Sequence, residues 1–292
     1  MNNSINDFLI LEELGRGSFG ITYKATRKYD NKIVAIKFIY IDKPGVNIDN
    51  ITEEITTLKD LNRCKYVIKY YGSFMGKLNN ENIFFIVMEY ADGYTLDKLL
   101  LNPAILKNPI ILWNIIFELI IGLKYIHDNG YAHRDIKPDN IMINKEGAVK
   151  YIDFGLSCLL KCKIDNCSNT CSDNSSTGTG TPAFIPLEIW NKNADPSLNG
   201  AKSWDIWSLS LVILLLVNLT DQLQFEKYLH RTTIYIDMIN SLTNNNIQPP
   251  NYTFDDGRTN NFVNKILVID WIHRPNIDEL LTLFLVNGLS DF

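Results

Sequence analysis

The order of apolar and polar positions divides the chain into a strand-rich first third and a largely helical remainder. Residues 21–26 and 33–39 are rich in β-branched and aromatic side chains and flank a turn signal at 29–32, which predicts a β-hairpin. Between residues 47 and 61, apolar side chains recur at the spacing of a helix. An apolar run at residues 84–88 predicts a further strand, so a sheet and one helix are expected in this part.

Helical patterns dominate the rest of the chain. Residues 112–128 carry a strong apolar stripe and end at an Asn-Gly pair, which is a typical helix stop. Residues 141–143 and 149–152 instead alternate as two short strands and predict a second hairpin. The apolar run at 209–217 is far too short to span a bilayer and predicts a buried helix.

Composition and charge indicate a soluble globular protein. The chain has 292 residues, 46% hydrophobic and 21% charged, which suits one large domain or two lobes. A net charge of −5 argues against nucleic acid as the main partner. The first residues show no signal sequence, and five cysteines in that context suggest reduced thiols. We therefore expect a cytoplasmic protein without a membrane span.

The segment richest in chemistry follows the predicted 112–128 helix. Residues 133–140 read H-R-D-I-K-P-D-N, which combines acids, bases, an amide and a proline. Thirteen residues after Asn140 stands Asp153, followed by Phe-Gly. The predicted hairpin between them would bring Asn140 and Asp153 to the same end of two paired strands. Their oxygen atoms are hard ligands suited to Mg²⁺.

Three glycines near the N-terminus, Gly15, Gly17 and Gly20, form the pattern G-x-G-x-x-G. The same pattern marks dinucleotide sites, but there a helix must follow the last glycine, whereas here a predicted strand follows. The glycines therefore belong in a hairpin, where backbone N–H groups can approach phosphate closely. An ordinary glycine-rich turn is the alternative for this motif by itself.

A lysine and a glutamate form an expected ion pair. Lys37 lies in the second predicted strand. Glu54 falls within the apolar stripe of the predicted helix, between Ile51 and Leu58, whereas Glu53 falls on its polar side. A carboxylate on a buried face requires a cation, and Lys37 is the expected partner of Glu54.

Three later segments extend the set of motifs. Residues 180–188 read G-T-P-A-F-I-P-L-E, Asp205 stands in S-W-D-I-W-S-L, and Arg274 stands in H-R-P. In this order and with these gaps, the motifs make the chain resemble the eukaryotic-type protein serine/threonine kinase family over residues 8–285. The family's usual Ala-Pro-Glu reads Pro-Leu-Glu here, a departure that concerns the local turn.

The resemblance implies an α+β, bilobal protein-kinase fold. A small β-rich N-lobe is expected at about residues 8–88, a hinge at about 89–93 and a larger α-helical C-lobe at about 94–285, with ATP between the lobes. The implied reaction is transfer of the γ-phosphate of ATP to serine or threonine hydroxyls of protein substrates, with Mg²⁺ as cofactor.

The implied catalytic residues are Asp135, Lys137, Lys37 and Glu54. Asp135 corresponds to the base that accepts the substrate hydroxyl proton and aims the oxygen at the γ-phosphorus. Lys137, which resembles serine/threonine rather than tyrosine kinases, neutralises the transferred phosphoryl group. In this family the equivalents of Lys37 and Glu54 orient the α- and β-phosphates, and those of Asn140 and Asp153 hold Mg²⁺.

The implied ATP-binding residues come from the glycine-rich hairpin, the strands and the hinge. Met88 is the expected gatekeeper, and backbone groups of Glu89 and Ala91 are expected to hydrogen-bond adenine. Thr22 replaces the valine that usually covers adenine, which we expect to weaken the apolar contact. The full expected set is Leu14, Gly15, Arg16, Gly17, Ser18, Phe19, Gly20, Thr22, Ala35, Lys37, Met88, Glu89, Ala91 and Met142.

Polar residues of the C-lobe are expected to be buried with partners. Glu188 and Arg274 should form a buried ion pair. Asp205 should cap the start of a helix and receive N–H groups of the 133–140 segment. His133 itself is expected to pack in the core.

Arg134 and Thr177 are the expected regulatory residues. In this family an arginine before the catalytic aspartate grips a phosphate of the activation segment, which corresponds to residues 156–181 here. Thr177 lies four residues before Thr181. We expect phosphorylation of Thr177 by an upstream activating kinase to order the segment through Arg134.

Four of the five cysteines fall in this segment, at Cys158, Cys162, Cys167 and Cys171. Four thiolates can hold a structural Zn²⁺, although the spacing C-x3-C-x4-C-x3-C is not the usual one. A redox disulfide and incidental thiols in a loop are the alternatives.

Two other functions share parts of these motifs. A pseudokinase or scaffold would bind nucleotide without efficient turnover, but the five residues expected to handle phosphate, metal and proton are all present: Lys37, Glu54, Asp135, Asn140 and Asp153. A kinase of small molecules shares the pattern H-x-D-x-x-x-x-N. Residues 180–188 and Arg274 favour a protein kinase over it.

Overall fold

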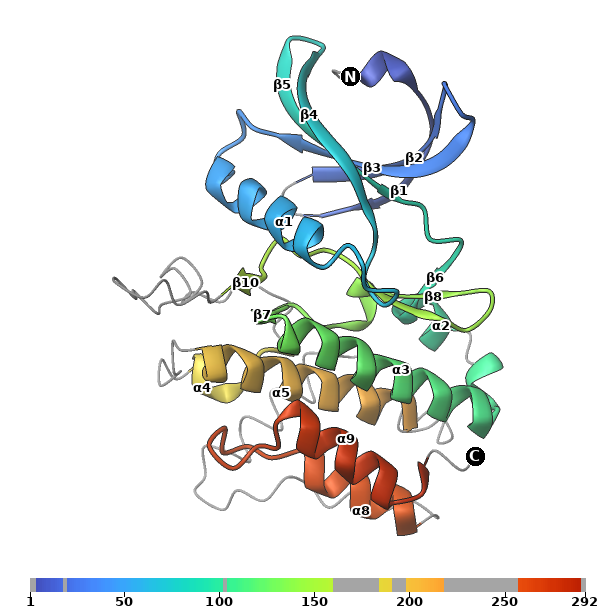
Figure 1. Ribbon diagram of the computed structural model, residues 1–292, viewed down its shortest axis with the longest axis vertical. Coiled ribbons are helices and arrows are strands. Elements are labelled where there is room, and N and C mark those ends of the chain that lie inside the picture. Colours follow the sequence, from blue (N-terminus) through green and yellow to red (C-terminus); the bar gives the residue numbers. More distant parts are fainter. Residues whose placement is uncertain are drawn as a thin grey trace. The chain divides into compact units, whose positions relative to one another are not determined.

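The computed structural model describes residues 4–17, 20–101, 104–159, 184–190, 198–217 and 257–289. The chain divides into two compact units, the first formed by residues up to Asp92 together with Phe154–Leu156, and the second by Gly93–Asp153 together with the residues from Ser157 onward. Figure 1 shows the strands and helices of each unit along the chain.

The first unit is a five-stranded antiparallel sheet with one α-helix. The strand order is β1-β2-β3-β5-β4, and every neighbouring pair is antiparallel. The predicted hairpin and the predicted 84–88 strand are both confirmed. The strands are β1 (Phe8–Arg16), β2 (Gly20–Arg27), β3 (Lys32–Tyr40), β4 (Tyr70–Leu78) and β5 (Glu81–Glu89), and the short helix η1 (Ile5–Asp7) precedes them.

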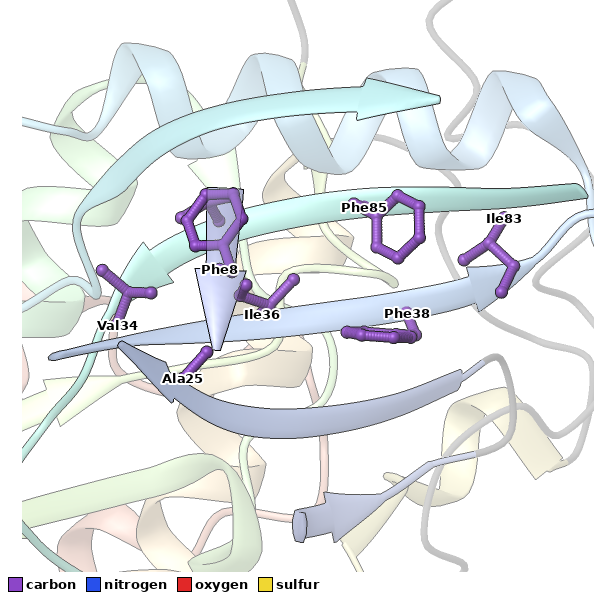
Figure 2. Close-up of a cluster of buried hydrophobic side chains, with 8 residues drawn as sticks. Phe8, Ala25, Val34, Ile36, Phe38, Ile83 and Phe85 are labelled. Carbon is purple, nitrogen blue, oxygen red and sulfur yellow. The ribbon is translucent and has the colours of Figure 1, made fainter. Parts of the chain in front are cut away.

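Aromatic and branched side chains from four strands form the core on one face of this sheet (Figure 2). The Phe85 ring is fully buried and lies 4.8 Å from the Phe38 ring and 4.9 Å from the Phe74 ring, centroid to centroid. Burying a phenylalanine of this kind contributes about 1.5–3 kcal/mol. The alternation in β3 and β5 that predicts strands therefore also builds the core of this unit.

The helix α1 (Ile48–Asp60) confirms the helix predicted at residues 47–61. Asn47 begins it, because its side-chain oxygen accepts the Asp49 N–H at 2.8 Å and satisfies a donor at the helix start. Apolar side chains of one face are buried, among them Ile51 and Leu58. Since Glu54 lies on the same face, burial of the helix also buries its carboxylate.

The second unit is mostly helical, with two small sheets. Strands β8 and β9 form the predicted second hairpin, with β6 beside β8, while β7 pairs with β10. The strands are β6 (Gly93–Thr95), β7 (Tyr131–Ala132), β8 (Ile141–Asn144), β9 (Val149–Tyr151) and β10 (Cys158–Leu159). The helices are α2 (Leu96–Leu101), η2 (Ile105–Lys107), α3 (Pro109–Asp128), η3 (Pro138–Asn140), α4 (Leu187–Trp190), α5 (Leu198–Val217), α8 (Gly257–Ile266) and α9 (Ile277–Val286).

Helix α3 confirms the helix predicted at 112–128 and starts slightly earlier. Asn108 caps it by accepting the Ile110 N–H at 3.0 Å, and a proline occupies the first turn, where its missing N–H costs nothing. Trp113 of α3 contacts Phe284 of α9, with ring centroids 6.1 Å apart, and Phe262 of α8 at 6.4 Å. These three rings join α3, α8 and α9 into one core.

By length and composition alone, α3 and residues 199–217 of α5 are long and apolar enough to cross a membrane. Within the fold, half of the apolar window of α3 and 78% of that of α5 are buried. Burial in the core of the second unit accounts for this apolar character, as predicted for residues 209–217. The helix containing that run begins at Leu198, so it is longer than the run itself.

Candidate functional site

The expected ion pair in the first unit is present. Lys37 lies in the middle of β3, and its Nζ is 2.7 Å from Glu54 Oε1 of α1. The two side chains are 13% and 5% exposed, so water screens the pair only weakly. Glu53 is exposed, which agrees with the choice of Glu54 made from the helical stripe.

The glycine-rich segment joins β1 to β2, as expected of a hairpin. Gly17 N–H donates to the Gly20 carbonyl at 2.9 Å, while Ser18 and Phe19 lie outside the described residues. A Cβ on Gly20 would stand 2.1 Å from the Phe38 carbonyl oxygen of β3, so strand pairing itself requires this glycine. A Cβ on Gly15 or Gly17 would meet no atom of the described residues within 4 Å. The fold therefore does not require those two, and the space beside them is open to a ligand.

The expected hinge follows β5. Met88, Ala91 and Ala35 are each 8% exposed, and Ala35 is paired with Met88 across β3 and β5. The Glu89 N–H donates to the Lys69 carbonyl at 2.8 Å. A hydrogen bond from a base to the Glu89 backbone would therefore have to come to its carbonyl oxygen. The ATP contacts of these residues stay a prediction.

Three side chains of residues 133–140 converge in the second unit. Lys137 Nζ lies 2.8 Å from Asp135 Oδ2, and Asn140 Nδ2 donates to the same oxygen at 2.7 Å. Asn140 Nδ2 also donates to the Asp135 carbonyl at 2.9 Å. Since both contacts that the described residues make to the carboxylate go to Oδ2, a proton arriving from outside would be accepted by Oδ1.

Asp205 holds the backbone of this segment. Its carboxylate is fully buried and accepts the N–H groups of His133 at 2.8 Å and Arg134 at 2.7 Å. The same carboxylate lies 2.9 Å from His127 Nε2 of α3. Arg134 has a φ of 65°, a left-handed conformation that a non-glycine residue keeps only where its surroundings hold it. The two bonds from Asp205 provide that support.

One part of the expectation for Asp205 is wrong. The residue does receive N–H groups of the 133–140 segment, but it does not cap a helix. Helix α5 begins at Leu198, so Asp205 lies well inside it and its own N–H is not among the unpaired donors of the first turn. The expectation of a helix start at Asp205 came from the family resemblance.

Asn140 and Asp153 are linked through the β8–β9 hairpin. The Ile152 N–H donates to the Asn140 carbonyl at 3.0 Å, so the residue just before Asp153 is tied to Asn140. Because the amide nitrogen of Asn140 donates to Asp135, its amide oxygen is the atom left to face a cation. Asp153 also has a left-handed backbone, with φ of 59°.

This donor set fits Mg²⁺. Among the described residues, no group of three or more His, Cys, Asp or Glu side chains could hold a metal. Mg²⁺ does not need one, because it commonly binds through one or two protein oxygens and completes its shell with phosphate oxygens and water. Asn140 and Asp153 supply such a pair.

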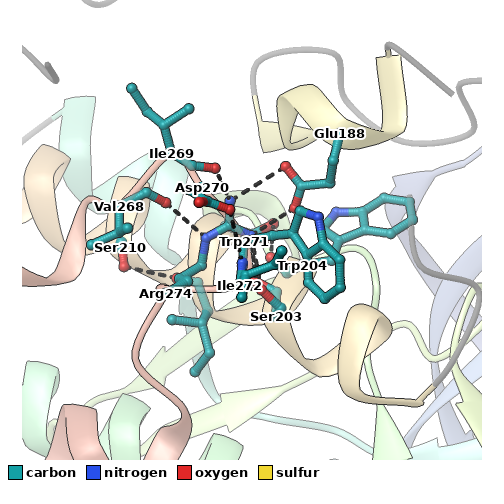
Figure 3. A network of polar contacts seen from close by, with 12 residues as sticks. Glu188, Ser203, Trp204, Ser210, Val268, Ile269, Asp270, Trp271, Ile272 and Arg274 are labelled. Atoms are coloured by element: carbon teal, nitrogen blue, oxygen red, sulfur yellow. Dashed lines mark hydrogen bonds and ion pairs between the residues drawn. The ribbon is translucent and has the colours of Figure 1, made fainter. Parts of the chain in front are cut away.

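Glu188 and Arg274 form the expected buried ion pair (Figure 3). Arg274 Nη1 lies 2.7 Å from Glu188 Oε1, and Nη2 lies 3.3 Å from Oε2. The guanidinium also donates to the backbone carbonyls of Ser203, Val268 and Ile269, and its side chain is fully buried. Arginine suits this position because its fork of N–H groups can satisfy several acceptors at once.

Only some of the residues expected to regulate the protein or to bind Zn²⁺ lie among the described residues. Arg134 is 7% exposed and its guanidinium lies over the Trp204 ring, 5.5 Å from the centroid, whereas Thr177 lies outside the described residues. Cys158 is buried in β10 beside Ala132 and Ala201. The other expected zinc ligands, Cys162, Cys167 and Cys171, lie outside the described residues, and nothing supports bound Zn²⁺.

Sequence reasoning missed three residues around this site. His127 contacts Asp205, Tyr151 Oη donates to the Leu119 carbonyl, and Glu118 accepts the Val149 N–H. The sequence does contain a signal for each of them. The apolar 112–128 helix contains a histidine and a glutamate, and the apolar 149–152 strand contains a tyrosine. Each is a polar group in a segment predicted to be buried, so each needs a partner.

Comparison with known proteins identifies similar sequences. The family model described as "Protein kinase domain" matches residues 8–284. The serine/threonine-protein kinase dst4 of Dictyostelium discoideum is 33% identical over 207 residues, covering 71% of this chain and 40% of that protein. The serine/threonine-protein kinase dst1 of the same organism is 32% identical over 279 residues, which cover 93% of this chain and 33% of that protein.

A relative from a second organism is similar to the same extent. The serine/threonine-protein kinase ppk11 of Schizosaccharomyces pombe is 33% identical over 207 residues, covering 69% of this chain and 58% of that protein. The matches thus span between about a third and somewhat more than half of the length of these three curated relatives.

Proposed function

Because the chain belongs to the protein kinase domain family, we propose that it transfers the γ-phosphate of ATP to serine or threonine hydroxyls of protein substrates. The relatives named as serine/threonine-protein kinases support this choice of acceptor. ATP and Mg²⁺ are the nucleotide and the cofactor that a protein kinase domain implies.

The observation that carries the proposal is the arrangement of Asp135, Lys137 and Asn140. The side chains of Lys137 and Asn140 are both held within hydrogen-bond distance of the Asp135 carboxylate, on a segment whose backbone is fixed by Asp205. A pseudokinase has no need to keep a carboxylate, an ammonium group and an amide in this geometry. The arrangement therefore supports turnover rather than nucleotide binding alone.

Each residue has a role that follows from its contacts. Asp135 Oδ2 is occupied by Lys137 and Asn140, so Oδ1 accepts the proton of the substrate hydroxyl as its oxygen attacks the γ-phosphorus. Lys137, held beside Asp135, offsets negative charge on the phosphoryl group during transfer. The bond that forms joins the hydroxyl oxygen to phosphorus, the bond to the β-phosphate oxygen breaks, and ADP leaves with its electron pair.

The ion pair of the first unit serves the nucleotide. Glu54 fixes Lys37 Nζ at one position, so the ammonium group can bind the α- and β-phosphates without first losing side-chain freedom. Asn140 and Asp153 would hold Mg²⁺, which neutralises phosphate charge when bound. The open space beside Gly15 and Gly17 allows backbone N–H groups to approach phosphate.

The decisive experiment compares the wild type with Asp135→Asn in Mg-ATP and a generic basic protein as acceptor. We expect phosphoserine or phosphothreonine from the wild type only, detected by radiolabel transfer and phosphoamino-acid analysis. Asp135→Asn preserves shape but removes the proton acceptor. If the wild type binds ATP yet transfers no phosphate, the chain is a pseudokinase. Transfer to a small metabolite instead of protein would identify a small-molecule kinase.

We also propose that phosphorylation of Thr177 by an upstream kinase activates the enzyme through Arg134. Support comes from the position of Arg134 next to Asp135, because a phosphate drawn to that guanidinium would bear directly on the 133–140 segment. The test measures turnover of fully phosphorylated wild type and of Thr177→Ala. Equal turnover would refute the proposal. Arg134→Lys should reduce activation, since lysine cannot grip phosphate in two places.

A cytoplasmic location is likewise proposed. It is supported by the five cysteines, which suit a compartment that keeps thiols reduced. Microscopy of a tagged chain in its own cells would test it, and localisation to a secretory compartment would refute it.

A further inference from the structure

The strand that leads to Asp153 is fastened to α3 by two side chains. Strand β9 has three residues and lies at the edge of its sheet, with β8 as its strand neighbour. On the other side it contacts α3, where Glu118 Oε2 accepts the Val149 N–H at 2.8 Å and Tyr151 Oη donates to the Leu119 carbonyl at 2.8 Å. Both ends of the strand are thus fixed to the helix.

These two bonds run in opposite directions. At the start of β9 the helix supplies the acceptor, and at its end the strand supplies the donor. Tyr151 is fully buried, and its hydroxyl donates to the Leu119 carbonyl. The Leu119 carbonyl can accept it because a carbonyl oxygen has a second lone pair beside the one used in the helix.

The fastened strand continues directly into the candidate metal site. Ile152 follows Tyr151 and donates its N–H to the Asn140 carbonyl. Its own carbonyl accepts a hydrogen bond from His133 Nε2 at 3.1 Å. The Tyr151 ring also packs against the His133 ring, with centroids 5.8 Å apart. Asp153 comes next, in a left-handed conformation that its surroundings must hold. The position of β9 therefore sets the position of the Asp153 carboxylate relative to Asn140.

We propose that Tyr151 and Glu118 are positioning residues for Asp153, which set its place beside Asn140 and thereby the affinity of this pair for Mg²⁺. The inference rests on the proposed function, because it concerns the metal site of that reaction. Neither residue touches the metal or the substrate in this role. Ordinary core packing is the competing explanation, and it predicts a loss of stability with unchanged metal binding.

The test uses Tyr151→Phe, Glu118→Ala and Glu118→Gln in the full chain. Tyr151→Phe keeps the ring and removes the donor. Glu118→Ala removes the acceptor, whereas Glu118→Gln restores an acceptor oxygen. The matched control is Ser210→Ala, which removes another fully buried hydroxyl that donates to helix carbonyls, those of Ile206 and Ile266.

Two measurements report on the metal. One is the Mg²⁺ concentration for half-maximal phosphate transfer at saturating ATP, and the other is the Kd of Mn²⁺ with ADP present, from electron paramagnetic resonance. We expect Tyr151→Phe and Glu118→Ala to raise both about tenfold, because residues that orient a metal ligand typically change affinity on that scale. Glu118→Gln and Ser210→Ala should stay within about twofold of the wild type, since Gln restores the acceptor and Ser210 lies outside the metal site. The KM for the protein substrate should be unchanged in all four.

The outcomes separate the two proposals. If Tyr151→Phe and Glu118→Ala lower the melting temperature while leaving Mg²⁺ and Mn²⁺ binding at the wild-type level, the positioning role is refuted. If the wild type transfers no phosphate, the proposed function fails, and the Mn²⁺ titration still decides the role of the two residues. Should Tyr151→Phe not fold, the contrast between Glu118→Ala and Glu118→Gln decides it.

Discussion

Lys37 and Glu54 in the first unit are joined by a bond between two side chains, whereas the 133–140 segment of the second unit is held through its backbone. The first bond links the middle of a strand to one face of a helix, and both groups reach it through flexible side chains. In the second unit a fully buried carboxylate inside α5 fixes two successive N–H groups. Breaking the first should therefore change activity more than stability, and breaking the second should change both.

The largest effect is expected from Asp205→Ala. It leaves the N–H groups of His133 and Arg134 and the His127 ring without their acceptor, so we expect a loss of about 4 kcal/mol of unfolding free energy. Urea unfolding followed by circular dichroism measures it. Asp205→Asn keeps one acceptor oxygen and should lose about half as much. A loss under about 1 kcal/mol in Asp205→Ala would contradict the importance given to these bonds.

Arg274→Met should come next. It leaves the Glu188 carboxylate in a largely buried site without its cation and frees the carbonyls of Val268 and Ile269, which we expect to cost about 3 kcal/mol. The same unfolding measurement applies. The unfolding free energy of Arg274→Lys should lie between those of Arg274→Met and the wild type, because lysine restores the charge but not the bidentate contact. If Arg274→Lys and Arg274→Met lose the same unfolding free energy, a positive charge is not what Glu188 requires.

Lys37→Met tests the side-chain ion pair of the first unit. Turnover should fall about 100-fold, since a positioned cation at the phosphates is removed. The unfolding free energy should fall by only about 1–2 kcal/mol, because a single side-chain hydrogen bond is lost and methionine fills the space that the lysine side chain leaves. Steady-state kinetics and urea unfolding of the same preparations measure the two effects. Lys32→Met, at the exposed start of the same strand, is the control and should match the wild type.

The smallest effect is expected at Asp30, in the first unit. The hydrogen-bonded Arg27 lowers its pKa from 3.8 to about 2. Because the folded-state value lies below the unfolded one, the interaction stabilises the protein above about pH 4, and its contribution is lost as the pH falls through 2. The stability difference between the wild type and Asp30→Asn should therefore be small at pH 7 and shrink as the pH falls from about 4 towards 2. A difference that persists unchanged at pH 2 would contradict this reading.

Sequence patterns were sufficient for β2, β3 and β5 of the first unit and for α1 and α3, because each has an apolar pattern of one period, whereas β1 and β4 were not predicted as strands. The pairing of Lys37 with Glu54 could be predicted for the same reason: the stripe of α1 shows which glutamate is buried. The pairing of Glu188 with Arg274 depended on the family resemblance, since 85 residues separate them in the chain.

Other contacts of polar groups inside buried segments could not be predicted. The place of Asp205 within α5 depends on where that helix begins, and a boundary is the part of a helix that local sequence specifies least. The bonds of Glu118 and Tyr151 link a helix to a strand about 30 residues later, and no local pattern reports which carbonyl or N–H lies opposite. The left-handed conformations of Arg134 and Asp153 are likewise imposed by tertiary contacts.

The apolar surface of α3 has a consequence during synthesis of the chain. Trp113 is covered by Phe262 and Phe284, which are translated about 150 and 170 residues later. At the usual 5–20 residues per second, the nascent helix waits roughly ten to thirty seconds for these partners. During that interval a membrane-like stretch is exposed at the ribosome, so a cotranslational chaperone should bind the growing chain there and release it once α9 has emerged.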